Sequence, residues 1–210
     1  MSSLARLGYE TRKRLPAWLR RTLRLGKLAL LPGQHSTPLP AELLEDCRMV
    51  VNRHELVKRL PPGGRVAEVG TFTGAFSRHI LDACAPDELH LVDLDFGALD
   101  PSVAADPRVR KYQGLSHDRL AAFPDAHFDW IYIDAGHGYA DVIRDANAAG
   151  PKVKPGGYLV FNDFAHMDPY LGAYGVHRAV VEFATREGWP FRFWAYEPSA
   201  LYDVALQRPG

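Results

Sequence analysis

The sequence predicts a single α/β domain built around a doubly wound, mostly parallel sheet. From about residue 65 onward, short apolar runs alternate with stretches of helical periodicity, which is the pattern of βαβ units. One run, residues 128–134, is almost continuously apolar, as expected for a strand buried on both faces. The length of 210 residues suits one domain with a sizeable core.

The N-terminal part of the chain is expected to be helical. Residues 11–30 place leucines and a tryptophan among basic residues at the spacing of an amphipathic helix. Residues 34–40 contain two prolines and indicate a linker, and residues 41–60 repeat apolar side chains at three-to-four spacing, which predicts a further helix. We therefore divide the chain into a basic helical segment with its linker, 1–40, and a domain, 41–210.

The alternating region is expected to contain seven strands with helices between them. The predicted strands are 65–69, 89–93, 109–113, 128–134, 158–162, 191–195 and 201–205, and the predicted helices are 74–84, 139–149 and 176–186.

Charge is distributed unevenly although the net charge is zero. Residues 1–31 carry eight basic side chains and one acid, so the rest of the chain is acidic by the same amount. This segment has three open interpretations: a peripheral membrane contact, packing on its own chain or on a second subunit in a homodimer, or a solvated helix. The zero net charge gives no reason to expect a nucleic-acid partner. Two cysteines without CxxC spacing fit a reducing, cytoplasmic location.

The first predicted strand leads into a glycine-bearing turn, Glu68-Val69-Gly70-Thr71-Phe72-Thr73-Gly74, which opens a helix. Glycines allow a sharp turn and a close approach to a ligand, and the helix start offers unpaired N–H groups. Since no glycine lies between Gly70 and Gly74, the dinucleotide fingerprint GxGxxG is absent. A turn without a ligand remains the alternative.

An acidic residue ends the second predicted strand. Asp93 is placed to accept hydrogen bonds from both ribose hydroxyls of a nucleoside ligand, and Asp95 is a nearby competitor. A surface loop acid is the alternative for either residue.

These features, together with Gln113-Gly114 and Lys154-Pro155-Gly156-Gly157, resemble class I S-adenosylmethionine-dependent methyltransferases. Asp134-Ala135-Gly136-His137-Gly138-Tyr139 and Asn162-Asp163 look like the small bacterial subgroup that includes macrocin-type sugar O-methyltransferases. The resemblance covers about residues 60–185. It implies a Rossmann-like, seven-stranded sheet with one antiparallel strand, and S-adenosylmethionine as cofactor. The cofactor contacts that it implies are Glu68, Gly70, Thr71, Phe72, Gly74, Asp93, Gln113, Gly114, Ser116 and Asp134.

The chain departs from the subgroup at one position. Leu115 stands where the subgroup often has an acid, so Ser116 or a backbone group would have to contact the adenine amine.

Asp134 and Asp163 end the fourth and fifth strands, which are neighbours in the implied topology. Two carboxylates at the carboxyl edge of a sheet repel each other unless they share a proton or a cation. A hard divalent ion such as Mg²⁺ suits such a pair, and Asn162 is a candidate third ligand. Metal-dependent O-methyltransferases that this chain resembles hold their ion with such a pair. A turn cap is the alternative role for Asp163.

His137 follows Asp134 by three residues and opens the next helix. With a pKa near neutrality, its imidazole is a candidate general base for a substrate hydroxyl, with Asp134 beside it in the catalytic site. A helix cap is the alternative. The polar and aromatic loop that includes His166 and Tyr174 either covers the site or is solvated.

Together these observations predict an S-adenosylmethionine-dependent enzyme that methylates a hydroxyl of a small molecule of sugar or natural-product type, with a divalent metal as a candidate aid. Two alternatives stay open: a nicotinamide-dependent oxidoreductase, which the missing GxGxxG disfavours, and a non-catalytic nucleoside-binding protein on the same fold.

Overall fold

A computed structural model describes residues 37–168 and 172–210 of the chain. The expectations for the basic N-terminal helix, and for its membrane or subunit contacts, lie outside the described residues. Most of the predicted N-terminal segment, 1–40, therefore also lies outside the described residues.

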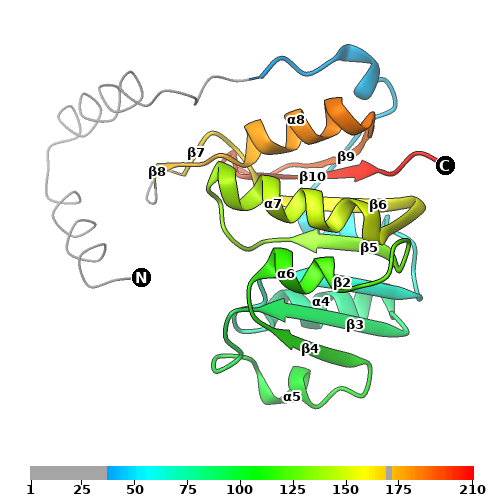
Figure 1. Ribbon diagram of the computed structural model, residues 1–210, viewed down its shortest axis with the longest axis vertical. Coiled ribbons are helices and arrows are strands. Elements are labelled where there is room, and N and C mark those ends of the chain that lie inside the picture. Colours follow the sequence, from blue (N-terminus) through cyan, green and yellow to red (C-terminus); the bar gives the residue numbers. More distant parts are fainter. Residues whose placement is uncertain (1–36, 169–171) are drawn as a thin grey trace, which may run out of the picture.

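The described chain is organised around one large, mostly parallel sheet (Figure 1). Its strand order is β1-β9-β10-β6-β5-β2-β3-β4. The strands are β1 (Arg48–Val50), β2 (Arg65–Val69), β3 (Glu88–Asp93), β4 (Val109–Gln113), β5 (Phe128–Ile133), β6 (Val153–Phe164), β9 (Phe191–Ala195) and β10 (Tyr202–Gln207). Only β10 runs antiparallel to its neighbours, β6 and β9, and in Figure 1 its arrowhead points opposite to those of β3, β4 and β5. The doubly wound fold with one antiparallel strand is therefore confirmed.

The sheet has eight strands, so the expected number of seven is wrong. The additional strand, β1, lies in the region 41–60 that was expected to be one helix. That region instead forms the short 3-10 helix η1 (Ala41–Leu43), β1 and the helix α3 (Arg53–Val57). Asn52 separates strand from helix: its backbone is extended, and its side chain accepts a hydrogen bond from the Glu55 N–H at 2.9 Å. β1 pairs in parallel with β9, a partner so distant in sequence that helical spacing within 41–60 could not reveal it.

Helices cover both faces of the sheet. They are α4 (Ala75–Cys84), α5 (Pro101–Ala104), α6 (Ser116–Ala121), α7 (Tyr139–Ala149), η2 (Gly150–Lys152) and α8 (Val176–Glu187), and a small hairpin, β7 (Met167–Asp168) and β8 (Gly172–Ala173), precedes α8. In Figure 1 α6, α7 and α8 lie in front of the sheet and α4 lies behind it. The three predicted helices are confirmed with ends that differ by one residue at most.

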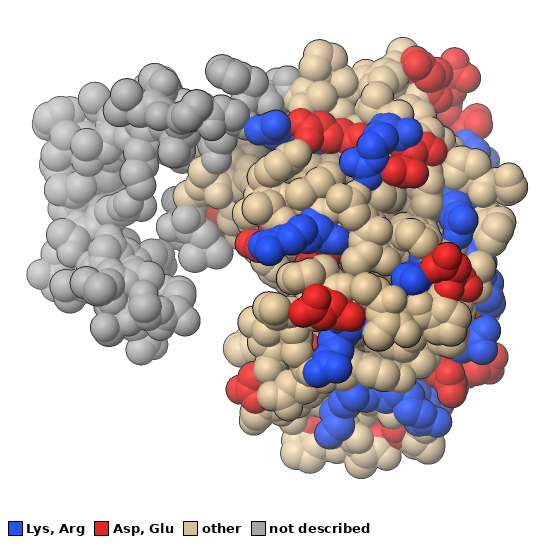
Figure 2. Space-filling model, viewed as in Figure 1, with Lys and Arg blue, Asp and Glu red and all other residues tan. Residues whose placement is uncertain are grey.

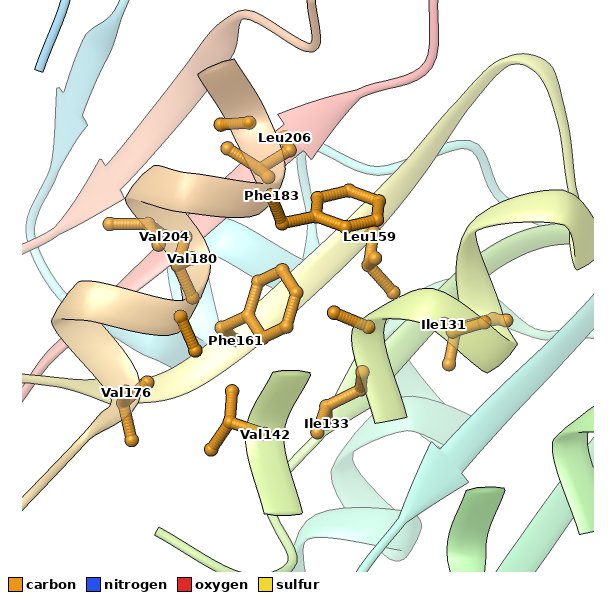
Figure 3. Close-up of a cluster of buried hydrophobic side chains, with 14 of the residues drawn as sticks. Ile131, Ile133, Val142, Leu159, Phe161, Val176, Val180, Phe183, Val204 and Leu206 are labelled. Atoms are coloured by element: carbon orange, nitrogen blue, oxygen red, sulfur yellow. The ribbon is translucent and has the colours of Figure 1, made fainter. Parts of the chain in front are cut away.

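Each face of the sheet carries its own apolar core. On the face of α7 and α8, side chains of both helices meet those of β5, β6 and β10 (Figure 3). Phe161 and Phe183 are fully enclosed at the centre of this cluster. On the opposite face, Leu56 of α3 and Ile80 of α4 pack with Trp130 and other strand residues. Because both faces are covered, the ends of the strands are left as the place where a ligand can enter.

No helix among the described residues is long and apolar enough to cross a membrane. Figure 2 shows acidic and basic side chains interspersed over the face that carries α7 and α8.

Candidate active site

A cleft of about 980 Å³ opens at the carboxyl ends of the parallel strands. Its walls are the turns that follow β2, β3, β4 and β5, with contributions from α3, α4 and α7. Of the predicted cofactor residues, the cleft is lined by Glu68, Gly70, Thr71, Phe72, Asp93, Gly114, Ser116 and Asp134. Gly74 and Gln113 do not line it.

The turn after β2 is held by the acid that ends β3. Asp93 Oδ2 accepts hydrogen bonds from the N–H groups of Thr71 (2.7 Å) and Phe72 (3.0 Å). Phe72 has a left-handed backbone (φ 48°), which these bonds help to fix. The predicted ribose contact of Asp93 therefore has to share this carboxylate with the turn.

The two glycines of this turn are required by the conformation and close packing of the backbone. A Cβ on Gly70 (φ +88°) would lie 1.9 Å from the carbonyl oxygen of Asp134, so only glycine allows the turns after β2 and β5 to approach each other. Gly74 precedes α4 with φ +78°, and a Cβ there would meet Leu99 at 2.6 Å. A substitution at either position would disturb the fold as well as any ligand.

Glu68 lies at the bottom of the cleft and is only 1% exposed. Its carboxylate accepts a hydrogen bond from the Ser77 hydroxyl of α4. Burial raises the pKa of Glu68 to about 8, against the opposing effect of the Ser77 hydrogen bond. This carboxyl group is therefore mainly protonated at neutral pH.

The wall formed after β3 and β4 contains two exposed leucines among polar residues. Leu94 and Leu115, 64% and 53% exposed, both line the cleft, although side chains of this type are usually buried. The Ser116 hydroxyl, predicted to face the adenine, donates a hydrogen bond to Asp145 Oδ1 at 2.5 Å. Leu115, where the subgroup often has an acid, makes this wall suited to a flat apolar ring.

The cleft also contains a buried polar atom without a partner. Thr71 Oγ1 has no hydrogen-bond partner among the described residues. Buried hydroxyls are nearly always paired, so this atom is consistent with a polar ligand in the cleft.

His137 lies between the two predicted carboxylates. Its Nε2 is 3.3 Å from Asp163 Oδ2 and 3.7 Å from Asp134 Oδ1, and its ring stacks on Tyr174 with centroids 4.6 Å apart. Burial lowers the pKa of His137, but the contact with Asp163 and the charges of both carboxylates outweigh it, so the pKa is raised. Burial also raises the pKa of Asp134, to about 7.

The helix-cap alternative for His137 is wrong, because Gly138 is the N-cap of α7 and no side chain caps it. Strand β6 extends through Asp163, whose backbone is left-handed (φ 54°). This unusual conformation for a non-glycine residue occurs where the carboxylate faces His137.

The predicted metal ligands do not form a metal-binding set in this arrangement. Asn162 donates from Nδ2 to Asp203 Oδ1 at 3.1 Å, and the imidazole of His137 lies between Asp134 and Asp163. Within residues 37–168 and 172–210, no group of three or more His, Cys, Asp or Glu side chains is placed to hold a metal ion. We therefore derive no step from a metal, and metal binding stays a prediction.

Sequence reasoning missed a polar row behind this site. Tyr132 of β5 donates a hydrogen bond to Asp203 of β10, and both residues are buried. Burial raises the pKa of Asp203 to about 6. Arg53 of α3 lies nearby, with Nη1 3.7 Å from Asp134 Oδ2. An acid within the apolar run of β10 was the one signal available in the sequence.

Comparisons with known proteins agree with this fold. Residues 67–164 match a family model described as a methyltransferase domain. No curated protein sequence matches the chain significantly.

Several solved structures share its fold. N-methyltransferase NodS from Bradyrhizobium japonicum WM9, in complex with S-adenosyl-L-homocysteine, has a TM-score of 0.55 at 16% identity, covering 75% of this chain and 86% of that one. An S-adenosylmethionine-dependent methyltransferase from Mesorhizobium loti has a TM-score of 0.54 at 16% identity, covering 73% and 96%. An O-methyltransferase family protein from Burkholderia thailandensis has a TM-score of 0.55 at 14% identity, covering 75% and 55%. At these identities the likeness shows a shared fold.

The methyltransferase domain match, the fold and the cleft at the carboxyl ends of the strands define the class of this protein. It is a class I S-adenosylmethionine-dependent methyltransferase.

Proposed function

We propose that this enzyme transfers the methyl group to a hydroxyl oxygen of a small molecule of sugar or natural-product type. The observation that carries the proposal is the placement of His137 between Asp134 and Asp163. Asp134 also lines the cofactor cleft, so the imidazole lies next to the place where the methyl donor binds. A hydroxyl has to lose its proton to become a strong nucleophile, and an imidazole held by carboxylates is suited to accept it.

Different residues of the chain have different roles in the proposed reaction. The turn after β2, with Asp93, holds the cofactor, and the apolar wall of Leu94 and Leu115 receives its ring. The bound cofactor supplies an already activated methyl group on its sulfonium. The protein therefore mainly aligns donor and acceptor. His137 takes the hydroxyl proton on its imidazole, while Asp163 and Asp134 stabilise the imidazolium that results.

The test is methyl transfer to a panel of hydroxylated sugars and phenols, followed by locating the methyl group in the product. His137→Ala should lower kcat about a hundredfold, the usual scale for a positioned proton acceptor. Affinity for S-adenosylhomocysteine, measured by calorimetry, should stay unchanged. His79→Ala, which removes an imidazole that does not line the cleft, is the matched control. A His137→Ala enzyme with wild-type kcat would refute the role of the base, and methyl groups found only on nitrogen would refute O-methylation.

Metal assistance is examined in the same assay. If Mg²⁺ is required, excess chelator abolishes turnover and the ion restores it. Full turnover in chelator would leave His137 and the two carboxylates to activate the hydroxyl alone.

A further inference from the structure

An arginine outside the matched methyltransferase segment reaches into the cofactor cleft. Arg53 belongs to α3, which precedes residues 67–164, and its side chain lines the cleft and is 39% exposed. The sequence motifs gave this residue no role.

The guanidinium of Arg53 is held from several sides. It lies 4.7 Å from the ring centroid of Phe76 at the start of α4, and 3.7 Å from Asp134 Oδ2. Although burial lowers the pKa of Arg53, its interactions with Tyr132, Asp203 and Asp134 outweigh that effect and raise the pKa. The side chain is therefore a fixed, permanently charged group with one part open to the cleft.

The order of the strands places Arg53 at a definite end of the cofactor. The apolar wall of Leu94 and Leu115 lies after β3 and β4, whereas Arg53 and Glu68 line the cleft beside β2 and β5. With the adenine against the apolar wall and the ribose near Asp93, the amino-acid portion of the cofactor points toward β2 and β5.

Charge selects which group meets the arginine. The amino-acid end carries an ammonium and a carboxylate, and the Asp134 carboxylate at this end suits the ammonium. Of the described residues that line the cleft, the arginines are Arg53 and Arg144, and Arg144 is paired with Asp141 of its own helix at 2.6 Å. Guanidinium binds carboxylate through paired, charge-assisted hydrogen bonds.

We propose that Arg53 binds the carboxylate of the cofactor's methionyl group. The eighth strand then helps to position this arginine. β1 pairs with β9 at the sheet edge, and the chain turns at Asn52 directly into α3, which carries Arg53. The inference depends on the cofactor and not on which atom accepts the methyl group.

The experiment compares two ligands that differ only at this carboxylate. Calorimetry measures the affinity of S-adenosylhomocysteine and of its decarboxylated analogue for the full chain. The wild type should bind S-adenosylhomocysteine about 10- to 100-fold more tightly, the scale of a hydrogen bond to a charged group. Arg53→Met, which keeps an apolar stem against Phe76, should lose that preference and bind both ligands like the wild type binds the analogue. Arg53→Lys should recover part of it. Arg59→Met, which removes an exposed arginine after α3, is the matched control.

Four results would overturn the proposal. Equal weakening of both ligands in Arg53→Met and Arg53→Lys would make the residue structural, as would a failure of both variants to fold by circular dichroism. Unchanged affinity for both ligands would assign Arg53 to an anionic group of the substrate. If the wild type bound neither ligand, the assignment of the cofactor itself would be wrong. This outcome is distinguished from the others because it is seen in the wild type, before any substitution.

Discussion

Single side chains at the carboxyl edge of the sheet hold ionisable groups in places where water is largely excluded. Glu68 and Asp203 are almost completely buried, and Asp134 lies between them in the order of the strands. The resemblance to class I methyltransferases implied Glu68, and the position of Asp134 at the end of a predicted strand indicated that residue. The sequence could not place Arg53 or Asp203 at this site, since their positions depend on pairing between segments far apart in the chain.

Glu68 should make the stability of the ligand-free protein fall as pH rises. Its pKa is about 8 when folded and near 4.5 when unfolded, so the unfolded carboxyl group ionises first and unfolding becomes more favourable between these values. Glu68→Gln should remove this loss, on the order of a few kcal/mol, when urea unfolding is measured at pH 5 and at pH 8. Glu45→Gln, at an exposed site, is the control. A pH dependence that is identical in wild type and Glu68→Gln would contradict the prediction.

Asp93 should contribute to folding before any cofactor binds. Asp93→Ala leaves the N–H groups of Thr71 and Phe72 without their carboxylate, and should destabilise the ligand-free protein by about 2 kcal/mol or more in urea unfolding. Asp95→Ala removes one hydrogen bond, from the Gly97 N–H, and should cost less. If Asp93→Ala were as stable as the wild type, the carboxylate would be available entirely for a ligand.

At the scale of elements, the starts of α7 and α8 meet beside the proposed base. The Gly175 N–H donates to the His137 carbonyl at 2.8 Å, and a Cβ on Gly175 would lie 2.1 Å from the Tyr139 nitrogen. Sequence periodicity predicted both helices well, because their apolar faces repeat over three turns. It failed for 41–60, where a strand of three residues is too short to show a period of its own.

Gly175→Ala should therefore disturb both the packing of these helices and the position of His137. We expect a loss of about 3 kcal/mol in the free energy of unfolding, with a lower kcat in the fraction that folds. Gly188→Ala is the matched control, since its Cβ meets no atom within 4 Å and only the left-handed backbone (φ +68°) costs about 1 kcal/mol. Equal losses in the two variants, measured by thermal unfolding, would show that the contact with Tyr139 relaxes easily.

At the scale of the whole molecule, the ligand cleft is built from turns on many strands, so a ligand should stabilise the entire domain. S-adenosylhomocysteine at a hundred times its Kd should add about 2.7 kcal/mol and raise the Tm by about 5–10 °C. NAD should leave the Tm unchanged, because the chain lacks GxGxxG. A shift with NAD and none with S-adenosylhomocysteine, in a scanning calorimeter, would reverse the assignment of the class.

The close approach of Gly70 to Asp134 has a consequence for engineering this enzyme. The Asp134 N–H also donates to the Val69 carbonyl at 2.7 Å, so the turn that holds the cofactor and the acid beside the base share one piece of backbone. Random libraries that vary either turn will lose cofactor affinity and turnover together, and a screen for new substrates would discard those variants for the wrong reason. Diversity is better introduced at Tyr174, which stacks on His137 but does not line the cofactor cleft.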